Sequence, residues 1–120
     1  MAQDLTVRPL SELSARCGQE SDNRIAVESL VDYSALPAPT LIARPEAVFV
    51  AVADIDDLGL WLQELGGKIH RTSAGDGLEL WTLLTQTPPS RRLGRVPVRV
   101  SVPVPMGELV MDYIRAAVAA

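Results

Sequence analysis

The residues whose type and spacing best suggest contact with a charged partner are four arginines near the C-terminal end. Arg91, Arg92, Arg95 and Arg99 fall within the stretch RRLGRVPVR. Guanidinium groups bind phosphates and carboxylates through rigid sets of N–H donors. The stretch has no interleaved aromatic residues, and the whole chain carries a net charge of −4. We therefore expect a solvated loop or contact with an anion or an acidic protein surface, and nucleic acid is the weaker alternative.

A second group consists of Trp81, Glu79 and His70. Trp81 and Glu79 share one face of the predicted strand LELWTLLT, and His70 lies in the preceding segment KIHRT. Tryptophan is enriched in binding surfaces, so a pocket or an interface at this place is one interpretation. His70 is the only histidine of the chain, and a metal site needs several ligands of suitable type. The group therefore predicts a pocket or an interface, without a metal.

Residues for catalysis are not arranged in a recognisable pattern. Cys17 is the only cysteine, which excludes an intramolecular disulfide, and it has no base nearby in the sequence. Asp54, Asp56 and Asp57 stand where a helix start favours acidic residues, and the ligand spacing of a calcium loop is missing. Neither a phosphate-binding glycine loop nor a nucleophile elbow is found. We expect no enzymatic activity and no cofactor.

The bulk composition predicts one globular domain. The chain has 120 residues, of which 48% are hydrophobic and 22% charged. Residues 1–66 hold four arginines against eleven acidic residues, whereas residues 67–120 hold seven basic residues against four acidic ones. Charges of opposite sign in the two halves favour attraction within the fold, self-association or an anionic partner. The N-terminus has neither a basic segment nor an apolar run, so we expect a cytoplasmic protein without membrane contact.

The elements with the clearest periodicity begin at residue 47. AVFVAVA at 47–53 is apolar on both faces, which is typical of a central strand covered on both sides. The acidic run Asp54, Asp56 and Asp57 is expected to supply the N-cap oxygen of the helix that follows, and Gly66-Gly67 to end it. The apolar stripe of that helix, which is expected to bury Trp61, consists of Leu58, Trp61, Leu62 and Leu65.

The remaining elements of this part are a hairpin, a further strand and a terminal helix. Strands at 68–72 and 78–85 flank a glycine-rich turn, and alternating valines predict a strand at 96–104. Pro97, Pro103 and Pro105 share one parity, so their missing N–H groups fall on one flank, and we expect this strand at a sheet edge. Its valines are expected to face the core. A helix is expected at 107–119, and 40–44 is a possible extra strand.

Residues 1–39 differ from the rest and are interpreted as an N-terminal arm, formed by short helices or partly disordered. A short helix from Pro9 to Gly18, a loop over 18–23 and a weak second helix or strand are expected, before a break at Pro37-Ala38-Pro39. Residues 40–120 are expected to form a compact α+β domain. Its mostly antiparallel four-stranded sheet has the order β-α-β-β-β-α from residue 47 and is packed by two helices.

The run VFVAVADIDDLGLWLQELGGKIHR, followed by two more strands, resembles the βαβββ half-module of the vicinal oxygen chelate superfamily. The resemblance covers residues 47–104. It implies a ligand-binding or degenerate domain that pairs with a second module through dimerisation. Members of that family place metal ligands of the His and Glu type on their strands. Here the first strand carries neither, and only His70 and Glu79 are chemically eligible.

These observations favour a small non-enzymatic interaction or regulatory protein that acts as a homodimer or as an accessory subunit of another protein. Small sheets leave unpaired edges, which association often covers, so we expect the proline-flanked strand or the terminal helix near the contact. The alternative is a small-molecule-binding domain with its pocket on the concave sheet face near Trp81, Glu79 and His70. A third possibility is weak nucleic-acid contact through the loop 91–99.

Overall fold

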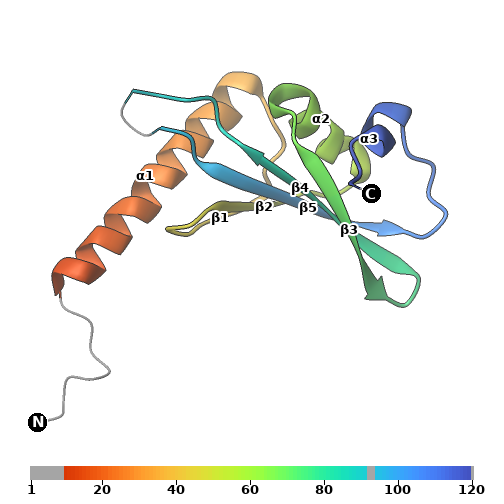
Figure 1. Ribbon diagram of the computed structural model, residues 1–120, viewed down its shortest axis with the longest axis horizontal. Coiled ribbons are helices and arrows are strands. Elements are labelled where there is room, and N and C mark those ends of the chain that lie inside the picture. Colours follow the sequence, from red (N-terminus) through yellow and green to blue (C-terminus); the bar gives the residue numbers. More distant parts are fainter. Residues whose placement is uncertain (1–9, 92–93, 120) are drawn as a thin grey trace, which may run out of the picture.

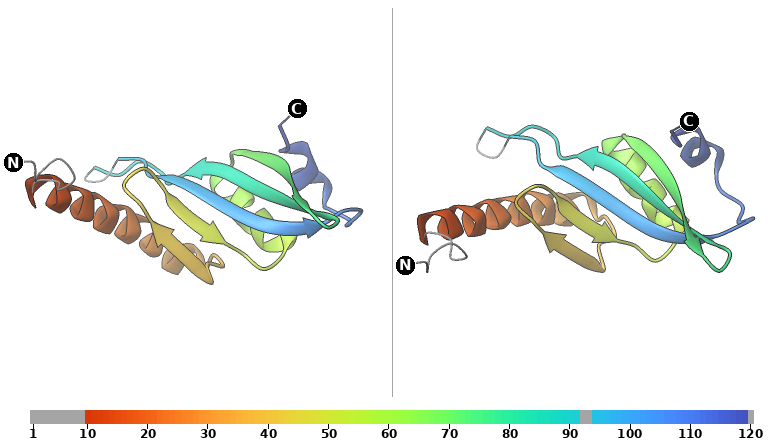
Figure 2. Two further views of the ribbon diagram at one scale, coloured as in Figure 1. Left: turned by 90° about the horizontal axis from the view of Figure 1, so that it is seen from below. Right: turned by 60° about the horizontal axis from the view of Figure 1, so that its bottom comes forward.

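A computed structural model describes residues 10–91 and 94–119 of the chain (Figure 1). Five strands form one sheet in the order β1-β2-β5-β4-β3. The helices gather on one side of this sheet, as two further views show (Figure 2). The elements in chain order are α1 (Leu10–Ser34), β1 (Thr40–Ala43), β2 (Val48–Ala51), α2 (Ile55–Leu65), β3 (Lys68–Gly75), β4 (Leu78–Gln86), β5 (Pro97–Pro105) and α3 (Asp112–Ala116).

The predicted α+β class is confirmed, with one strand more than expected. The possible extra strand forms as β1 and pairs antiparallel with β2, from Thr40 opposite Ala51 to Ala43 opposite Val48. β2 runs parallel to β5, whereas the pairs β4–β5 and β3–β4 are antiparallel. The sheet is therefore mixed and five-stranded.

β5 lies between β2 and β4 in the sheet, so the prediction of an edge strand is wrong. The parity argument behind it still holds, because the odd-numbered residues of β5 direct their backbone groups toward β2. The Ser101 carbonyl, for example, accepts from Val52 N–H at 3.0 Å. β2 is only four residues long and pairs with Val98–Ser101, which lies between Pro97 and Pro103. A short neighbour thus avoids the positions that cannot donate.

The core lies between the sheet and the helices. As predicted, the alternating valines of β5 face it, and Trp61 of α2 is fully buried against them. The indole Nε1 of Trp61 donates to the Pro37 carbonyl at 2.8 Å, which ties the connection after α1 to α2. The buried side chains of the sheet come from all five strands and are Ala43, Val48, Val50, Ile69, Trp81, Leu83, Val98, Val100, Val102 and Val104.

Helix α2 begins and ends as its sequence predicts. The Asp54 carboxylate accepts from the N–H groups of Asp56 at 2.9 Å and Asp57 at 3.1 Å, and Gly66 ends the helix with φ at 73°. Asp54→Ala is therefore expected to lower the free energy of unfolding by about 1 kcal/mol, since two helix N–H groups lose their acceptor. Asp54→Asn keeps a capping oxygen and should stay within a few tenths of the wild-type value in urea denaturation. Equal losses in both variants would contradict this role.

Helix α1 is one continuous helix over Leu10–Ser34, so the expected loop at 18–23 is wrong. Its C-terminal half packs on the sheet through Val27, and the buried amide of Asn23 donates to the carbonyls of Arg44 at 2.7 Å and Pro45 at 3.2 Å. These contacts hold a helix that the local sequence specifies poorly. Its N-terminal half extends beyond the sheet (Figures 1 and 2).

The terminal helix is shorter than expected, because α3 covers only Asp112–Ala116. Gly107 adopts a positive φ of 85° in a turn, and Leu109 is 91% exposed in the irregular connection that leads to α3. Ile114 is fully buried, and the segment after α3 pairs with the outer edge of β3. Ile69 N–H donates to the Ala117 carbonyl at 2.9 Å, and Ala119 N–H donates to the Ile69 carbonyl at 2.8 Å.

Candidate functional site

One face of the sheet is covered by none of the three described helices, and we call it the bare face. It consists of the strand side chains that point away from α2, which follow from the pairing registers and the alternation of strand side chains. The left view of Figure 2 shows the sheet in front of α2 from this side. The central positions of the bare face are Thr40, Ile42, Phe49, Ala51, Lys68, His70, Thr72, Leu80, Thr82, Leu84, Arg99, Ser101 and Pro103.

A row of three apolar and two cationic side chains crosses the bare face. Successive register partners in this row are Ile42, Phe49, Arg99, Leu84 and Lys68, one from each strand. Ile42 is 46% exposed and Leu84 is 37% exposed. Isolated exposed apolar residues are ordinary, whereas neighbouring ones on an uncovered sheet indicate a contact surface.

The charge of the bare face is of one sign. Its central positions include the cations Arg99 and Lys68 and the titratable His70, and none of the described strand residues that point to this side is acidic. Hydroxyl groups lie between the cations, with Thr82 Oγ1 and Ser101 Oγ hydrogen-bonded at 3.1 Å. The surface therefore suits a partner that offers carboxylates beside apolar groups.

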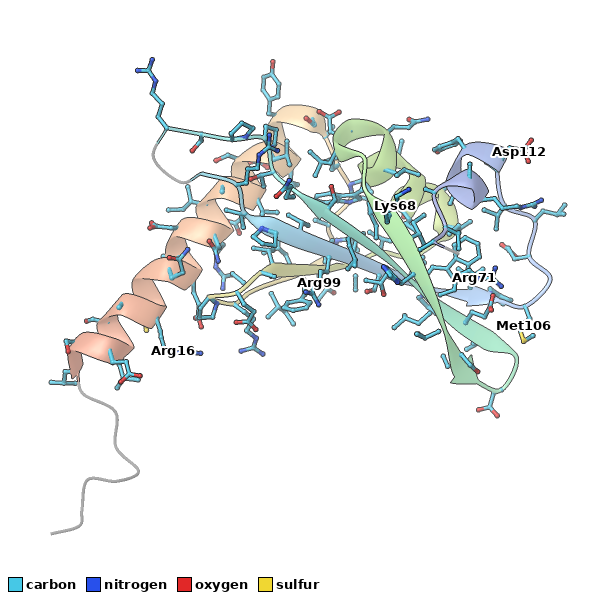
Figure 3. The ribbon with its side chains drawn as sticks, viewed as in Figure 1. Arg16, Lys68, Arg71, Arg99, Met106 and Asp112 are labelled. Carbon is cyan, nitrogen blue, oxygen red and sulfur yellow. The ribbon has the colours of Figure 1, made fainter. Side chains whose placement is uncertain are left out.

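Arg99 lies at the middle of the bare face, in the strand next to β2 (Figure 3). Its guanidinium carbon lies 5.9 Å from the ring centroid of Phe49, which is within the range of a cation–π contact. Such a contact holds the charge over the sheet while leaving its N–H donors available to an acceptor from outside. The side chain is exposed.

The arginine group predicted from the sequence divides between two places. Arg91 and Arg95 lie in the connection between β4 and β5, and Arg99 lies within β5 on the bare face. Two hydrogen bonds between Thr87 and Val96 hold the ends of this connection together. Thr87 N–H donates to the Val96 carbonyl, and Val96 N–H donates to Thr87 Oγ1, both at 2.9 Å. Arg92 lies outside the described residues.

Trp81 and Glu79 lie on the helix-covered face. Trp81 is only 5% exposed, and the Arg71 guanidinium carbon lies 5.2 Å from its ring centroid. Arg71 also donates to both carboxylate oxygens of Glu79, at 3.0 and 3.2 Å, and is labelled in Figure 3. These side chains line a cavity of about 170 Å³ together with Arg115. Typical ligand pockets hold about 300–1,000 Å³, so this one suits at most a very small molecule.

His70 points to the opposite side of β3 from this cavity, because it pairs with Thr82 on the bare face. Strand alternation thus places His70 on the opposite face of the sheet from Trp81 and Glu79. At the outer edge of β3, an open depression of about 390 Å³ is bordered by His70, Arg71 and Glu79. Across residues 10–91 and 94–119, no three His, Cys, Asp or Glu side chains lie close enough to hold a metal ion.

The ion pair of Glu79 makes a pH-dependent prediction. The hydrogen bonds from Arg71 hold the pKa of the Glu79 carboxyl below its ordinary value, and partial desolvation opposes them. The unfolded chain therefore binds this proton more readily, so the stabilisation is fully present above the unfolded-state pKa and is lost as pH falls through the folded-state value.

Glu79→Gln should accordingly be less stable than wild type above about pH 5, and the difference should shrink below about pH 3. Urea denaturation of both proteins across this range measures it. Arg71→Gln should reproduce the same pH dependence, since it removes the other partner. A difference that stays constant with pH would contradict the assignment.

The N-terminal half of α1 is the second unusual surface. Every residue from Leu10 to Gln19 is exposed, including Leu10, Leu13 and Cys17 at helical spacing. Glu12, Arg16 and Glu20 are spaced i, i+4 for two charge pairs worth about 0.3–0.5 kcal/mol each. Gly18 alone costs about 1 kcal/mol relative to alanine, before the serines of the segment are counted. This half is therefore a weak helix, and none of its residues from Leu10 to Gln19 is buried against residues 20–91 or 94–119.

An apolar groove lies where α1 meets the β4–β5 connection. It has a volume of about 230 Å³ and is bordered by Ile25, Ala26, Leu30, Thr87 and Pro88, among others. The groove belongs to the junction that seats the C-terminal half of α1. No described helix is long and apolar enough to cross a membrane.

Sequence reasoning missed the bare face because both faces of 47–53 are apolar, which predicted cover on both sides. Phe49 is in fact half-buried and stands on the uncovered side. The signal lay in β4, where Leu80, Thr82 and Leu84 alternate with Trp81 and Leu83. Apolar residues therefore occur on both faces of this strand, with Leu80 and Leu84 on one face and Trp81 and Leu83 on the other. Such a pattern is typical of a strand with a contact surface on each face.

Comparison with known proteins gives no relative: no family model, no curated protein and no solved structure matches this chain. The order β2-α2-β3-β4-β5 is the βαβββ order that the vicinal oxygen chelate resemblance implies. The functional part of that resemblance stays a prediction. Its two eligible ligands, His70 and Glu79, project from opposite faces of the sheet.

Proposed function

We propose that this protein is a small interaction protein without catalytic activity that acts as a homodimer, with the bare face as its contact surface. The observation that carries the proposal is the row Ile42, Phe49, Arg99 and Leu84 on a sheet face that no described helix covers. Burying apolar side chains of this kind contributes about 25 cal/mol per Å² of surface removed from water. A second copy of the chain is the partner that is always available.

The contact is assigned to a face of the sheet rather than to its β3 edge. The segment after α3 already occupies that edge at Ile69, through backbone hydrogen bonds with Ala117 and Ala119. Two copies therefore meet an obstacle to strand-to-strand pairing there. The outer flank of β1 is four residues long, which offers few hydrogen bonds. The bare face spans all five strands and provides the larger area.

A pair of matched variants tests the surface. Leu84→Glu places a charge on the bare face opposite Lys68, which leaves a favourable cross-strand pair and so preserves the fold. Leu60→Glu makes the same change on the exposed side of α2, at 45% exposure against 37% for Leu84. Sedimentation equilibrium should show at least a tenfold weaker association for Leu84→Glu, about 1.4 kcal/mol, and wild-type association for Leu60→Glu.

Two outcomes would contradict the proposal. One is equal association of the two variants, which would place the contact elsewhere. The other is a wild-type chain that stays monomeric yet forms a salt-dependent complex with an oligonucleotide, because the cations of the bare face would then serve nucleic acid. Thermal unfolding of both variants checks that neither result reflects loss of the fold.

A further inference from the structure

We propose that the segment covering the bare face is the N-terminal half of α1 from a second copy, so that two chains exchange their N-terminal helices. This inference rests on the proposed homodimer and names the segment that each copy contributes. Residues Leu10–Gln19 of α1 are exposed along their whole length, and they continue a helix that the C-terminal half anchors on the sheet. The chain thus has an uncovered helix and an uncovered sheet face.

The stripe that this helix offers differs from the one that its own sheet uses. Leu10, Leu13 and Cys17 follow one another at i, i+3 and i+7, and Glu20 extends the same side. The anchored half instead packs through Asn23 and Val27. At 3.6 residues per turn, the mean direction of Leu10, Leu13 and Cys17 is rotated by about 90° from that of Asn23 and Val27, while Val31, which packs against the core, lies on the side of Leu13.

The dimensions of the two surfaces agree. A helical segment from Leu10 to Gln19 is about 15 Å long at 1.5 Å per residue. A five-stranded sheet has four strand spacings of about 4.8 Å, or about 19 Å in width. The exposed half of α1 is therefore long enough to lay its apolar stripe over the row from Ile42 to Leu84, which spans three strand spacings or about 14 Å.

Charge complementarity favours α1 of a second copy, rather than the bare face of a second copy, as the partner of the bare face. A symmetric contact of two bare faces brings Arg99 and Lys68 toward identical cations, and like charges across an interface are costly. Within Leu10–Gln19, Glu12 is balanced by Arg16, which is labelled in Figure 3, and Glu20 and Asp22 follow directly, so residues 10–22 of α1 have a net charge of −2. An acidic helix on a cationic face matches the opposite charges of the two halves of the sequence.

Site-directed thiol cross-linking tests this arrangement with the full chain. Cys17 is exposed, is the only cysteine, and lies on the stripe. Wild type is mixed with a Cys17→Ser chain that carries Ala51→Cys, Thr82→Cys or Leu80→Cys on the bare face, and a short bismaleimide is added. The matched control carries Cys17→Ser with Gln63→Cys, an exposed position on α2.

We expect at least one of the three bare-face chains to cross-link to wild type about a hundredfold faster than the control chain does. A thiol held at a contact faces its partner at an effective concentration on the order of millimolar, against roughly ten micromolar for chains that meet at random. Three positions are used because the place where Cys17 lies on the face differs between possible tilts of the helix.

The other outcomes separate the two proposals. A mass of two chains, with rapid cross-linking of a Cys17→Ser bare-face chain to itself and none to wild type, would overturn the helix exchange and leave the homodimer standing. A mass of two chains with cross-linking at the control rate throughout would overturn the exchange as well. A mass of one chain together with control rates would overturn both.

Discussion

Trp61→Ala is expected to lower the free energy of unfolding by about 3–5 kcal/mol. The indole is fully buried in the core between α2 and the sheet, and alanine leaves a cavity at this point. The Pro37 carbonyl also loses its donor, because the Nε1–H group 2.8 Å away is removed. Domains of this size are stable by about 5–15 kcal/mol, so the variant should lose a substantial fraction of its total stability. Urea denaturation followed by circular dichroism measures the loss.

Two control variants test whether the loss of stability in Trp61→Ala is specific to the buried indole. Leu60→Ala lies on the exposed side of the same helix and should change stability by less than about 0.5 kcal/mol. Trp61→Phe retains most of the buried volume but not the hydrogen bond, so it should fall between wild type and Trp61→Ala. A loss below 1 kcal/mol for Trp61→Ala would show that the core does not depend on the contact between α2 and the connection after α1.

Arg99→Glu should weaken self-association by about thirtyfold, or about 2 kcal/mol. The substitution puts a carboxylate at the middle of a surface whose other charges are cationic and which, by our proposal, faces the acidic half of α1. The same exchange at Arg115, an exposed position on α3, is the control and should leave association unchanged. Sedimentation equilibrium at low salt measures both variants.

Salt adds a second criterion to this experiment. The association of wild type should weaken as the salt concentration rises, because salt screens the attraction between exposed charges. The association of Arg99→Glu should depend less on salt than that of wild type. If Arg99→Glu associated more strongly than wild type, the proposal that the bare face contacts an acidic surface would be contradicted. Such a result would indicate that the partner surface is itself cationic, as two facing bare faces are.

The α2 region was the part of the fold that the sequence predicted best. Asp54, the stripe around Trp61 and the stop at Gly66 are local signals, and each depends on residues within a few positions of one another. The valines of β5 were also assigned correctly to the core, because alternation fixes which side chains share a face. Such features need no knowledge of distant segments.

The position of β5 and the continuity of α1 depended on distant segments and were therefore missed. Three prolines of one parity exclude a long hydrogen-bonded neighbour, but the four residues of β2 fit between them. Gly18 and Asn23 suggested an interruption in α1, yet the Asn23 amide is used in hydrogen bonds to the turn between β1 and β2. Local propensity was overridden in both places by tertiary contacts.

The candidate site shows the same division. Arg99 was named from the sequence, but its place beside Phe49 follows from the parallel pairing of β2 and β5. Trp81, Glu79 and His70 were grouped because their strands are neighbours, and strand alternation separates His70 from the other two. The sequence predicted which side chains of one strand share a face, but it did not predict which face of the sheet the helices cover.

The central claim is that the bare face is covered by a second copy of this chain. The mass of the full chain in solution, measured by sedimentation equilibrium from micromolar to millimolar concentration at low salt, tests it most directly. The account predicts a transition to twice the chain mass of 12.9 kDa within this range. A mass of one chain at every concentration would contradict it.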